Sequence, residues 1–239
     1  MTETYMLTLP REVGKKAIKV MIEANDCKKW IVAKETGKNG YEHYQIRLQT
    51  SNDQFFHWVK DHMPKAHVEA CTDTWEYERK EGQYWTSQDT ALIRQSRFGK
   101  PNKQQENFLK MLKTQSDRQI DVIYDEKGGW GKSWLTRHLW ETKQCYYVPP
   151  TVSSVQGLIQ WVASGYDGEP IIIIDIPRSW KWSEPLYTAI ESIKDGMVYD
   201  TRYSAKMRDI WGVKVVCMTN AMPKVDKLSA DRWRISVVG

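Results

Sequence analysis

The stretch VIYDEKGGWGKSWL, residues 122–135, decides the fold of the second half of the chain. An apolar run predicts a strand, a glycine-rich loop follows it, and the residues from Lys132 onward predict a helix. Glycines let such a loop curl so that its N–H groups point at phosphate oxygens, while Lys132 reaches the outer phosphates and Ser133 ligates Mg²⁺. The stretch therefore predicts a site for a nucleoside triphosphate. The expected phosphate-binding residues are Gly128, Gly129, Gly131, Lys132 and Ser133.

One position of this loop departs from the usual phosphate-loop pattern. The pattern G-x-x-x-x-G-K-S has its first glycine where this chain has Glu126, and we expect Gly128 and Gly129 to compensate. An ordinary loop is the alternative interpretation, because Gly-Lys-Ser is common by chance. The strand before the loop and the helix after it favour the phosphate-binding interpretation.

Two further strands end in polar residues that suit the same site. Asp175 follows four consecutive isoleucines, and its carboxylate can hold Mg²⁺ or a water bound to Mg²⁺. Asn220 follows the apolar residues 215–218, and its amide can contact the outer phosphate or orient the attacking water. Taken singly, each fits a plain strand with a polar end equally well. Ligands of open α/β sheets collect at the carboxyl ends of the strands, so together they support one site.

The second half as a whole alternates strands and helices, which predicts parallel α/β units and a three-layer α/β domain over residues 119–239. The predicted strands are residues 122–124, 145–148, 171–174 and 213–218. Residues 98–118 precede this domain and are rich in lysine and arginine. They predict a basic linker that contains an oligomerisation helix at residues 104–114.

The first half, residues 1–97, predicts an α+β domain with one antiparallel sheet. Its predicted strands are residues 5–9, 30–33, 43–48 and 67–70, and its predicted helices are residues 11–25, 52–62 and 74–85. The turn at residues 37–40 joins two alternating segments, so we expect strands 30–33 and 43–48 to be neighbours.

Chemically suggestive side chains gather along this first half. His43 and Gln45 lie two apart on a strand and so share a face, and Glu35 at the end of the neighbouring strand completes an O and N ligand set for Mg²⁺ or Mn²⁺. Tyr77 and Lys80 lie three apart on a predicted helix, which places a phenol and an ammonium on one face. A tyrosine nucleophile needs a polarised phosphate and a nearby cation, and this set supplies both. Taken singly, each residue fits a core or surface role better.

Composition bounds the class of protein. The chain has 239 residues, a formal net charge of +5 and four widely spaced cysteines without a C-x-x-C pair. No apolar run approaches the roughly 20 residues of a membrane span, and the start lacks a signal-peptide pattern. We expect an intracellular protein with no membrane contact. Basic residues are in excess within residues 94–118 and 202–234, which suits a polyanion, and exposed members of the twelve tryptophans could stack on unpaired bases.

Taken in order, these motifs resemble the rolling-circle replication initiators of circular single-stranded DNA viruses, the CRESS-DNA viruses. These proteins fuse an HUH-type endonuclease to a superfamily 3 helicase, and the resemblance spans nearly the whole chain. Residues 5–11 look like the first endonuclease motif, residues 43–45 like the second and residues 77–82 like the third. The loop at 125–133, residues 173–178 and residues 228–233 look most like smacovirus initiators.

The resemblance implies origin nicking and joining by Tyr77 through a 5′-phosphotyrosyl link, with Lys80 as its helper, and ATP-driven DNA unwinding. It implies Mg²⁺ or Mn²⁺ at Glu35, His43 and Gln45, and an ATPase that uses Lys132, Ser133, Asp175 and Asn220. It further suggests that Arg232 is an arginine finger and that residues 191–214 hold a DNA-gripping hairpin around Lys206. Many superfamily 3 enzymes have a second acid where this chain has Ile176, which leaves Glu126 as a candidate base.

The implied partners are single-stranded DNA, an origin hairpin and further copies of the chain in a hexameric ring. The implied location is the host nucleus for a eukaryotic host and the host cytoplasm otherwise. Two alternatives stay open. One is an ATP-driven helicase or packaging motor whose N-terminal domain binds DNA without cutting it, and the other is a nucleotide-regulated RNA-binding protein without catalysis.

Overall fold

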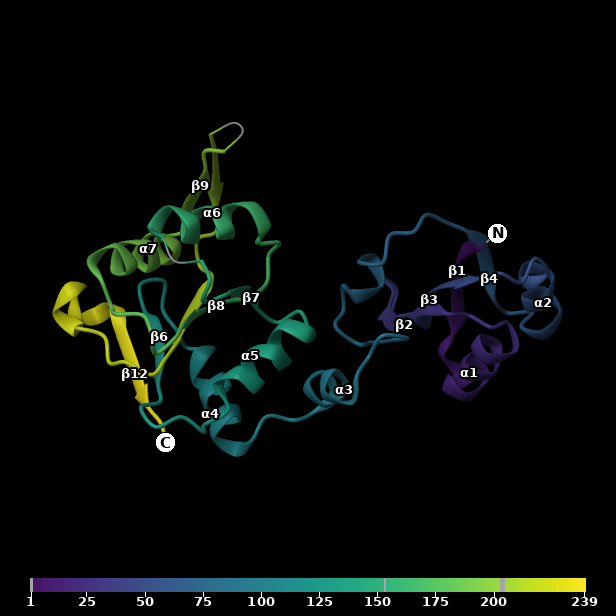
Figure 1. Ribbon diagram of the computed structural model, residues 1–239, viewed down its shortest axis with the longest axis horizontal. Helices are drawn as coiled ribbons and strands as arrows, with labels where there is room; N and C mark the ends of the chain where they lie inside the picture. The colour runs from purple at the N-terminus through teal and green to yellow at the C-terminus, as the bar shows by residue number, and fades with distance from the viewer. Residues whose placement is uncertain (1, 153, 203–204) are drawn as a thin grey trace. The chain divides into compact units, whose positions relative to one another are not determined.

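The chain folds into two compact units, residues 1–98 and 99–239, in a computed structural model that describes residues 2–152, 154–202 and 205–239 (Figure 1). The first unit is an α+β fold with an antiparallel sheet. The second is a separate parallel sheet with helices. Across the described residues, no helix combines the length and the apolar character that a membrane crossing requires.

The first unit is built on a five-stranded sheet in the order β4-β1-β3-β2-β5 with antiparallel pairing. Its strands are β1 Glu3–Pro10, β2 Lys29–Thr36, β3 Glu42–Thr50, β4 His67–Ala70 and β5 Tyr84–Thr86. Its helices are α1 Gly14–Ala24, α2 Phe55–His62 and α3 Ala91–Phe98, with short 3-10 turns η1 Arg11–Val13 and η2 Tyr77–Arg79. The predicted pairing of the strands at 30–33 and 43–48 is confirmed.

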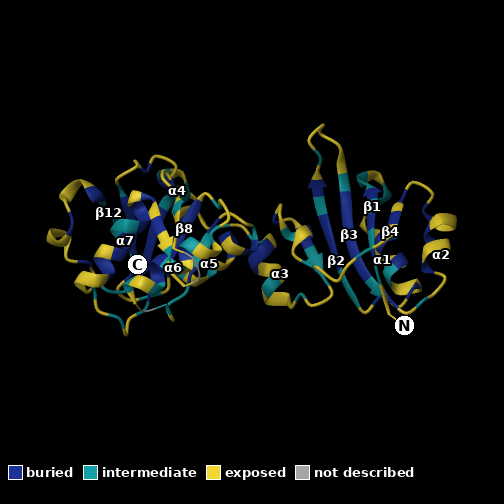
Figure 2. Cartoon of the chain, turned by 90° about the horizontal axis from the view of Figure 1, so that it is seen from above, coloured by how far each residue is buried: buried dark blue, intermediate teal, exposed yellow. Residues whose placement is uncertain are grey.

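One face of this sheet carries the core of the first unit. Tyr44, Ile46 and Leu48 of β3 pack with the apolar sides of α1 and α2 in one buried cluster. Because successive strand residues point to opposite faces, His43, Gln45 and Arg47 lie on the other face. Figure 2 shows β3 buried along most of its length, although only one face carries α1 and α2.

The predicted helix at residues 74–85 is wrong. This segment forms the short turn η2 and then the edge strand β5, which pairs with β2. Gly82 has a φ of 68°, a left-handed conformation that interrupts a helix. Tyr84 and Trp85 then gain ladder hydrogen bonds from the sheet edge, which a helix in this place would forgo.

The second unit is built on a five-stranded parallel sheet in the order β12-β6-β11-β8-β7. Its strands are β6 Ile120–Tyr124, β7 Tyr146–Val148, β8 Ile171–Ile176, β11 Lys214–Thr219 and β12 Trp233–Val237. Its helices are α4 Lys103–Leu112, α5 Lys132–Glu141, α6 Val155–Gly165 and α7 Glu184–Asp195. A hairpin, β9 Met197–Asp200 with β10 Lys206–Asp209, and the turns η3 Val225–Lys227 and η4 Ala230–Arg232 complete it. Strand β12 was not among the predicted strands.

Helices cover both faces of this parallel sheet, which gives three layers (Figure 1). Ile172 and Ile174 of β8 pack in a cluster with α6 and α7, whereas Ile171 and Ile173 pack in a cluster with α4 and α5. Helix α4 lies within the basic segment 98–118 and contributes Phe108 and Leu112 to the second cluster. Its start is fixed by a capping box between Asn102 and Gln105.

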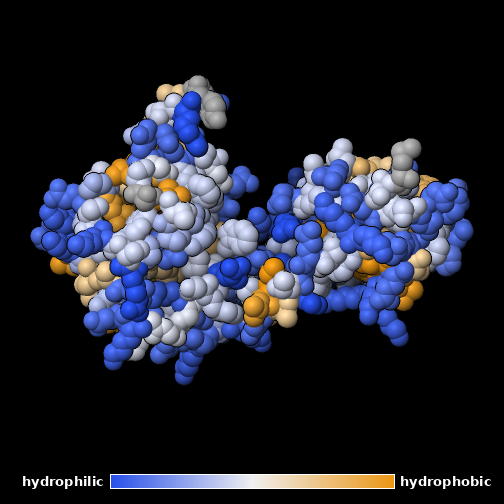
Figure 3. All heavy atoms as spheres, viewed as in Figure 1, coloured by the Kyte–Doolittle hydropathy of each residue, from blue (hydrophilic) through white to orange (hydrophobic). Residues whose placement is uncertain are grey.

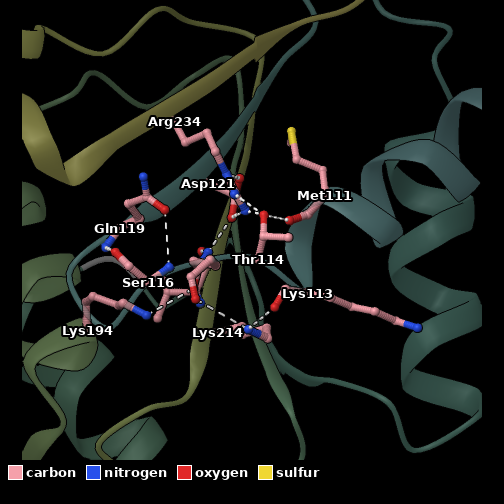
Figure 4. A network of polar contacts seen from close by, with 11 residues as sticks. Met111, Lys113, Thr114, Ser116, Gln119, Asp121, Lys194, Lys214 and Arg234 are labelled. Atoms are coloured by element: carbon pink, nitrogen blue, oxygen red, sulfur yellow. Dashed lines mark hydrogen bonds and ion pairs between the residues drawn. The ribbon is translucent and has the colours of Figure 1, made fainter.

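A buried polar network ties α7 to the sheet and to the loop before β6 (Figure 4). Lys194 is 1% exposed and donates from Nζ to Gln115 Oε1 at 3.0 Å and to the Val213 carbonyl at 2.9 Å. Gln115 also donates to Asp121, and Arg234 pairs with Asp121 from β12. Burial, helped by the nearby charge of Lys214, lowers the pKa of Lys194 to about 8.

This shift predicts a stability that depends on pH. An unfolded lysine keeps its proton to about pH 10, so between about pH 8 and pH 10 the unfolded chain binds more protons than the folded one. The Lys194 contribution to the unfolding free energy therefore rises with pH, by about 1 kcal/mol per pH unit at most. The measurement is the unfolding free energy in urea from pH 7.5 to 9.5, for the wild-type chain and for Lys194→Met, with the exposed Lys110→Met as control. If wild type and Lys194→Met show the same change of unfolding free energy with pH, Lys194 is not the source of the pH dependence.

Candidate functional site

The three predicted metal ligands lie on the face of the first sheet that does not carry α1 and α2. Glu35 of β2 is directly opposite His43 of β3 in the strand register, and Gln45 is two residues along β3. The Nε2 atom of His43 lies 3.8 Å from Glu35 Oε2. The strand pairing thus brings together residues that are up to ten positions apart in the chain.

Neighbouring groups contact two of these three side chains, and the third is buried. The carbonyl of Tyr41 lies 3.1 Å from His43 Nδ1, which suits a proton on Nδ1 and would leave Nε2 as the nitrogen open to a metal. Thr8 donates to Gln45 Oε1 at 3.0 Å. Glu35 is only 4% exposed, and its Oε1 atom is buried without a hydrogen-bond partner among the described residues.

This donor set fits a hard divalent cation. A buried carboxylate oxygen without a partner is costly, and a cation would satisfy it. In the described part of the chain, no three side chains of the His, Cys, Asp and Glu types converge to hold a metal. The ligand set consists instead of one carboxylate, one imidazole and one amide.

Tyr77 and Lys80 lie beside this ligand set. Tyr77 is 55% exposed, which argues against a core role, and Lys80 Nζ lies 3.6 Å from the centre of the Tyr77 ring. The same ammonium pairs with Glu35 Oε2 at 2.6 Å. Burial alone would lower the pKa of Lys80, but hydrogen bonding to Glu35 and Tyr77 outweighs it and raises the pKa above its ordinary value. Tyr77, Lys80, Glu35 and His43 therefore form one continuous cluster.

A buried ion pair that the sequence motifs did not reveal anchors the turn that carries Tyr77. Glu78 is 1% exposed, and its Oε1 atom lies 2.9 Å from Arg47 Nε on β3. Arg47 also donates to the Thr72 carbonyl. Because Arg47 follows Gln45 at strand spacing, the ion pair fixes the tyrosine turn to the strand that carries two of the ligands. Arg47 occupies a polar position of an alternating strand, so the sequence alone gave no sign that it is paired in the interior.

The predicted phosphate loop of the second unit lies between β6 and α5. Gly128, Gly129 and Gly131 have φ values of 85°, 103° and 90°, which other residues rarely adopt. A Cβ atom at Gly131 would lie 2.8 Å from Gln105 Nε2. Gln105 donates to the carbonyls of Trp130 and Gly131, so α4 supports the loop from one side.

The inner side of the loop is occupied by a carboxylate that the motif did not single out. Asp125 accepts hydrogen bonds from the N–H groups of Gly128 at 2.8 Å and Trp130 at 3.2 Å, and from Lys132 Nζ at 2.8 Å. Burial would raise the pKa of Asp125, but these donors, Lys132 foremost, more than offset it and lower the pKa. Asn220 donates to the Asp125 carbonyl, which places it next to the loop as predicted.

Asp175 and Ser133 line one cavity of about 360 Å³ beside the loop. Asp175 accepts a hydrogen bond from the Tyr147 hydroxyl at 3.0 Å. Burial raises the pKa of Asp175, while Tyr147 and Lys132 oppose the shift. Asp175 lies on β8 and Asn220 follows β11, the strand between β6 and β8. The predicted polar groups thus meet at the carboxyl ends of three adjacent strands.

Arg232 lies away from the surface. It is 5% exposed and pairs with Glu191 at 3.0 Å and with Asp195 at 2.7 Å, both on α7. These contacts join η4 to α7 within the same chain.

The hairpin β9–β10 lies within the range suggested for a DNA-gripping element. Lys206 is exposed at the start of β10 and pairs with Asp200 in register. Met197 and Met207 are also exposed. The face of the molecule in Figure 3 is mainly hydrophilic, with small separate apolar patches. Exposed tryptophans include Trp140, Trp161 and Trp211.

Comparison with known proteins finds relatives among viral replication proteins. The master replication protein of Subterranean clover stunt virus (strain F) is 28% identical over 123 residues, 52% of this chain and 41% of the relative. The master replication protein of Banana bunchy top virus (isolate Autralia) is 30% identical over 118 residues, 49% of this chain and 39% of the relative. Para-Rep C10 of Milk vetch dwarf C10 alphasatellite is 30% identical over 136 residues, 55% of this chain and 46% of the relative.

The matched part of this chain thus spans less than half the length of these curated relatives. No family model matches the chain. The relatives support the resemblance to a viral replication protein and do not favour the smacovirus subgroup in particular.

The ion pair under the tyrosine turn predicts a stability effect. Glu78→Ala leaves Arg47 buried without its counter-charge, so we expect the unfolding free energy of the first unit to fall by about 3–5 kcal/mol. Denaturant unfolding of the full chain measures the change. The matched control is Glu76→Ala, an exposed residue two positions away, which should change it by no more than about 0.5 kcal/mol. Similar effects for the two variants would show that the pair does not anchor the turn.

Proposed function

We propose that the chain initiates rolling-circle replication of a circular single-stranded DNA genome. The first unit would act as an HUH-type endonuclease that nicks and rejoins origin DNA. The second unit would act as a superfamily 3 ATPase that unwinds DNA. The observation that carries the proposal is the continuous cluster of Tyr77, Lys80, Glu35 and His43, which joins a nucleophile, a cation and metal ligands on one sheet face.

In the proposed nicking reaction the Tyr77 oxygen attacks the scissile phosphorus of single-stranded DNA. A phosphotyrosyl bond forms, the bond to O3′ breaks, the phenol loses its proton and O3′ gains one. Lys80 would favour the phenolate and the developing charge. A divalent cation held by Glu35, His43 and Gln45 would polarise the phosphate. The energy of the broken bond is kept in the phosphotyrosyl link, so the reverse reaction rejoins DNA without ATP.

The second unit would bind ATP with Mg²⁺ at the loop. Lys132 and the loop N–H groups would hold the phosphates, Ser133 and Asp175 would hold the cation, and Asn220 would contact the outer phosphate or the attacking water. Glu126 is exposed and stays a candidate for the base, because Ile176 follows Asp175.

The proposed partners are single-stranded DNA, an origin hairpin and further copies of the chain in a hexameric ring, in the host nucleus where the host is eukaryotic and in the host cytoplasm otherwise. The exposed hairpin around Lys206 supports a DNA contact. An arginine-finger role for Arg232 stays a prediction, and it would require both ion pairs with α7 to break.

The nicking proposal predicts that Tyr77→Phe reduces cleavage of a labelled origin oligonucleotide in Mn²⁺ by at least about 1,000-fold. The phenylalanine keeps the ring that Lys80 contacts and removes only the attacking oxygen. The control is Tyr166→Phe in the second unit. Mass spectrometry of the trapped adduct should locate the 5′-phosphate on Tyr77. Cleavage that persists in Tyr77→Phe would leave a motor with a non-catalytic DNA-binding unit as the better account.

The ATPase proposal predicts that Lys132→Ala lowers ATP turnover by at least about 100-fold, because the Lys132 ammonium would stabilise the charge that develops on the outer phosphates. Phosphate release by the full chain measures it. Lys127→Ala removes an exposed charge from the same loop and serves as control. Equal turnover in wild type and Lys132→Ala would contradict the proposed site.

A further inference from the structure

The carboxylate of Asp125 lies where a bound phosphate would be expected. Asp125 follows β6 directly and is 1% exposed. Its Oδ1 atom accepts the N–H of Gly128, and its Oδ2 atom accepts the N–H of Trp130 and the Lys132 ammonium. Both carboxylate oxygens are therefore held by donors of the loop.

These donors are the ones that a phosphate-binding loop offers to its ligand. A backbone N–H carries one hydrogen, so Gly128 and Trp130 cannot fully serve Asp125 and a phosphate oxygen together. The Lys132 ammonium has three hydrogens, but a phosphate beside Asp125 would place two anions in one buried site, which is unfavourable. Asp125 and a phosphate thus compete for the same N–H donors and for the positive charge of Lys132.

The backbone around Asp125 is fixed, whereas the loop glycines are conformationally free. The Asp125 N–H donates to the Thr219 carbonyl at 3.0 Å, and the Asp125 carbonyl accepts from Asn220. A carboxylate that leaves the loop must therefore do so by rotation of its side chain, without movement of β6. Gly128 and Gly129 lack the Cβ atoms that would hinder rearrangement of their N–H groups.

We propose that Asp125 is an internal ligand of the loop, and that nucleotide binds by exchange with it. In the absence of nucleotide the carboxylate keeps Lys132 neutralised and the loop N–H groups satisfied. An incoming phosphate chain takes over these donors and displaces the carboxylate. Asp125 therefore weakens the affinity of the loop for phosphates and eases the release of product. The inference rests on the proposed nucleotide site and adds to it a residue that sets its affinity.

The test is the affinity of the full chain for a non-hydrolysable ATP analogue, adenylyl imidodiphosphate with Mg²⁺, measured by isothermal titration calorimetry. Asp125→Asn removes the charge and keeps the shape. We expect its Kd to be about tenfold lower than that of wild type, because loss of one charge-assisted contact corresponds to about that factor. Asp167→Asn, an exposed carboxylate in the same unit, should leave the Kd unchanged.

A second variant guards against a folding defect. Asp125→Ser keeps a small oxygen acceptor near the loop N–H groups, and it should also bind more tightly than wild type. Unchanged or weaker binding in folded Asp125→Asn or Asp125→Ser overturns the inference. Loss of the folded second unit in both variants overturns it as well, because Asp125 would then be a structural residue.

Failure of the nucleotide site itself has a different signature. In that case wild type, Lys132→Ala and both Asp125 variants would all show no binding heat. If wild type binds and Lys132→Ala does not, the site stands, and only the order of affinities among the Asp125 variants decides the inference.

Discussion

A β-strand sends successive side chains to opposite faces, and both units depend on this alternation. In β3 it assigns Tyr44, Ile46 and Leu48 to the core while it presents His43 and Gln45 on the other face. In the second unit the same alternation divides the isoleucines of β8 between two helical layers. Helices pack on both faces of this sheet, so the ends of its strands stay open. The loop, Asp175 and Asn220 lie at the carboxyl ends.

Each candidate site contains one lysine that suits phosphate chemistry, and each lysine pairs with a buried carboxylate. Lys80 pairs with Glu35, and Lys132 pairs with Asp125. A partly buried ammonium needs a counter-charge, and in each unit a buried acid supplies it. The two units have different sheets, one antiparallel and one parallel, yet each holds its lysine against a buried carboxylate. A substrate phosphate would meet a lysine that is already in position.

Local sequence predicted the elements whose signal lies in neighbouring residues. The glycine-rich loop before α5, the pairing of β2 with β3 and the shared face of His43 and Gln45 follow from short-range patterns. The edge strand β5 was taken for a helix, because its stability comes from β2, more than fifty residues earlier. The roles of Glu78 and Asp125 also depend on partners, Arg47 and the curled loop, that only the folded chain brings close.

One side chain of α4 contacts both its own helix start and the glycine-rich loop of the second unit. Gln105 both caps the start of α4 and donates to the carbonyls of Trp130 and Gly131. The amide oxygen of Gln105 accepts the N–H of Asn102 at the start of α4, and its amide nitrogen donates to the loop. Both polar groups of this one side chain are therefore used, one by the helix and one by the loop. A substitution at Gln105 would affect the helix start and the loop together.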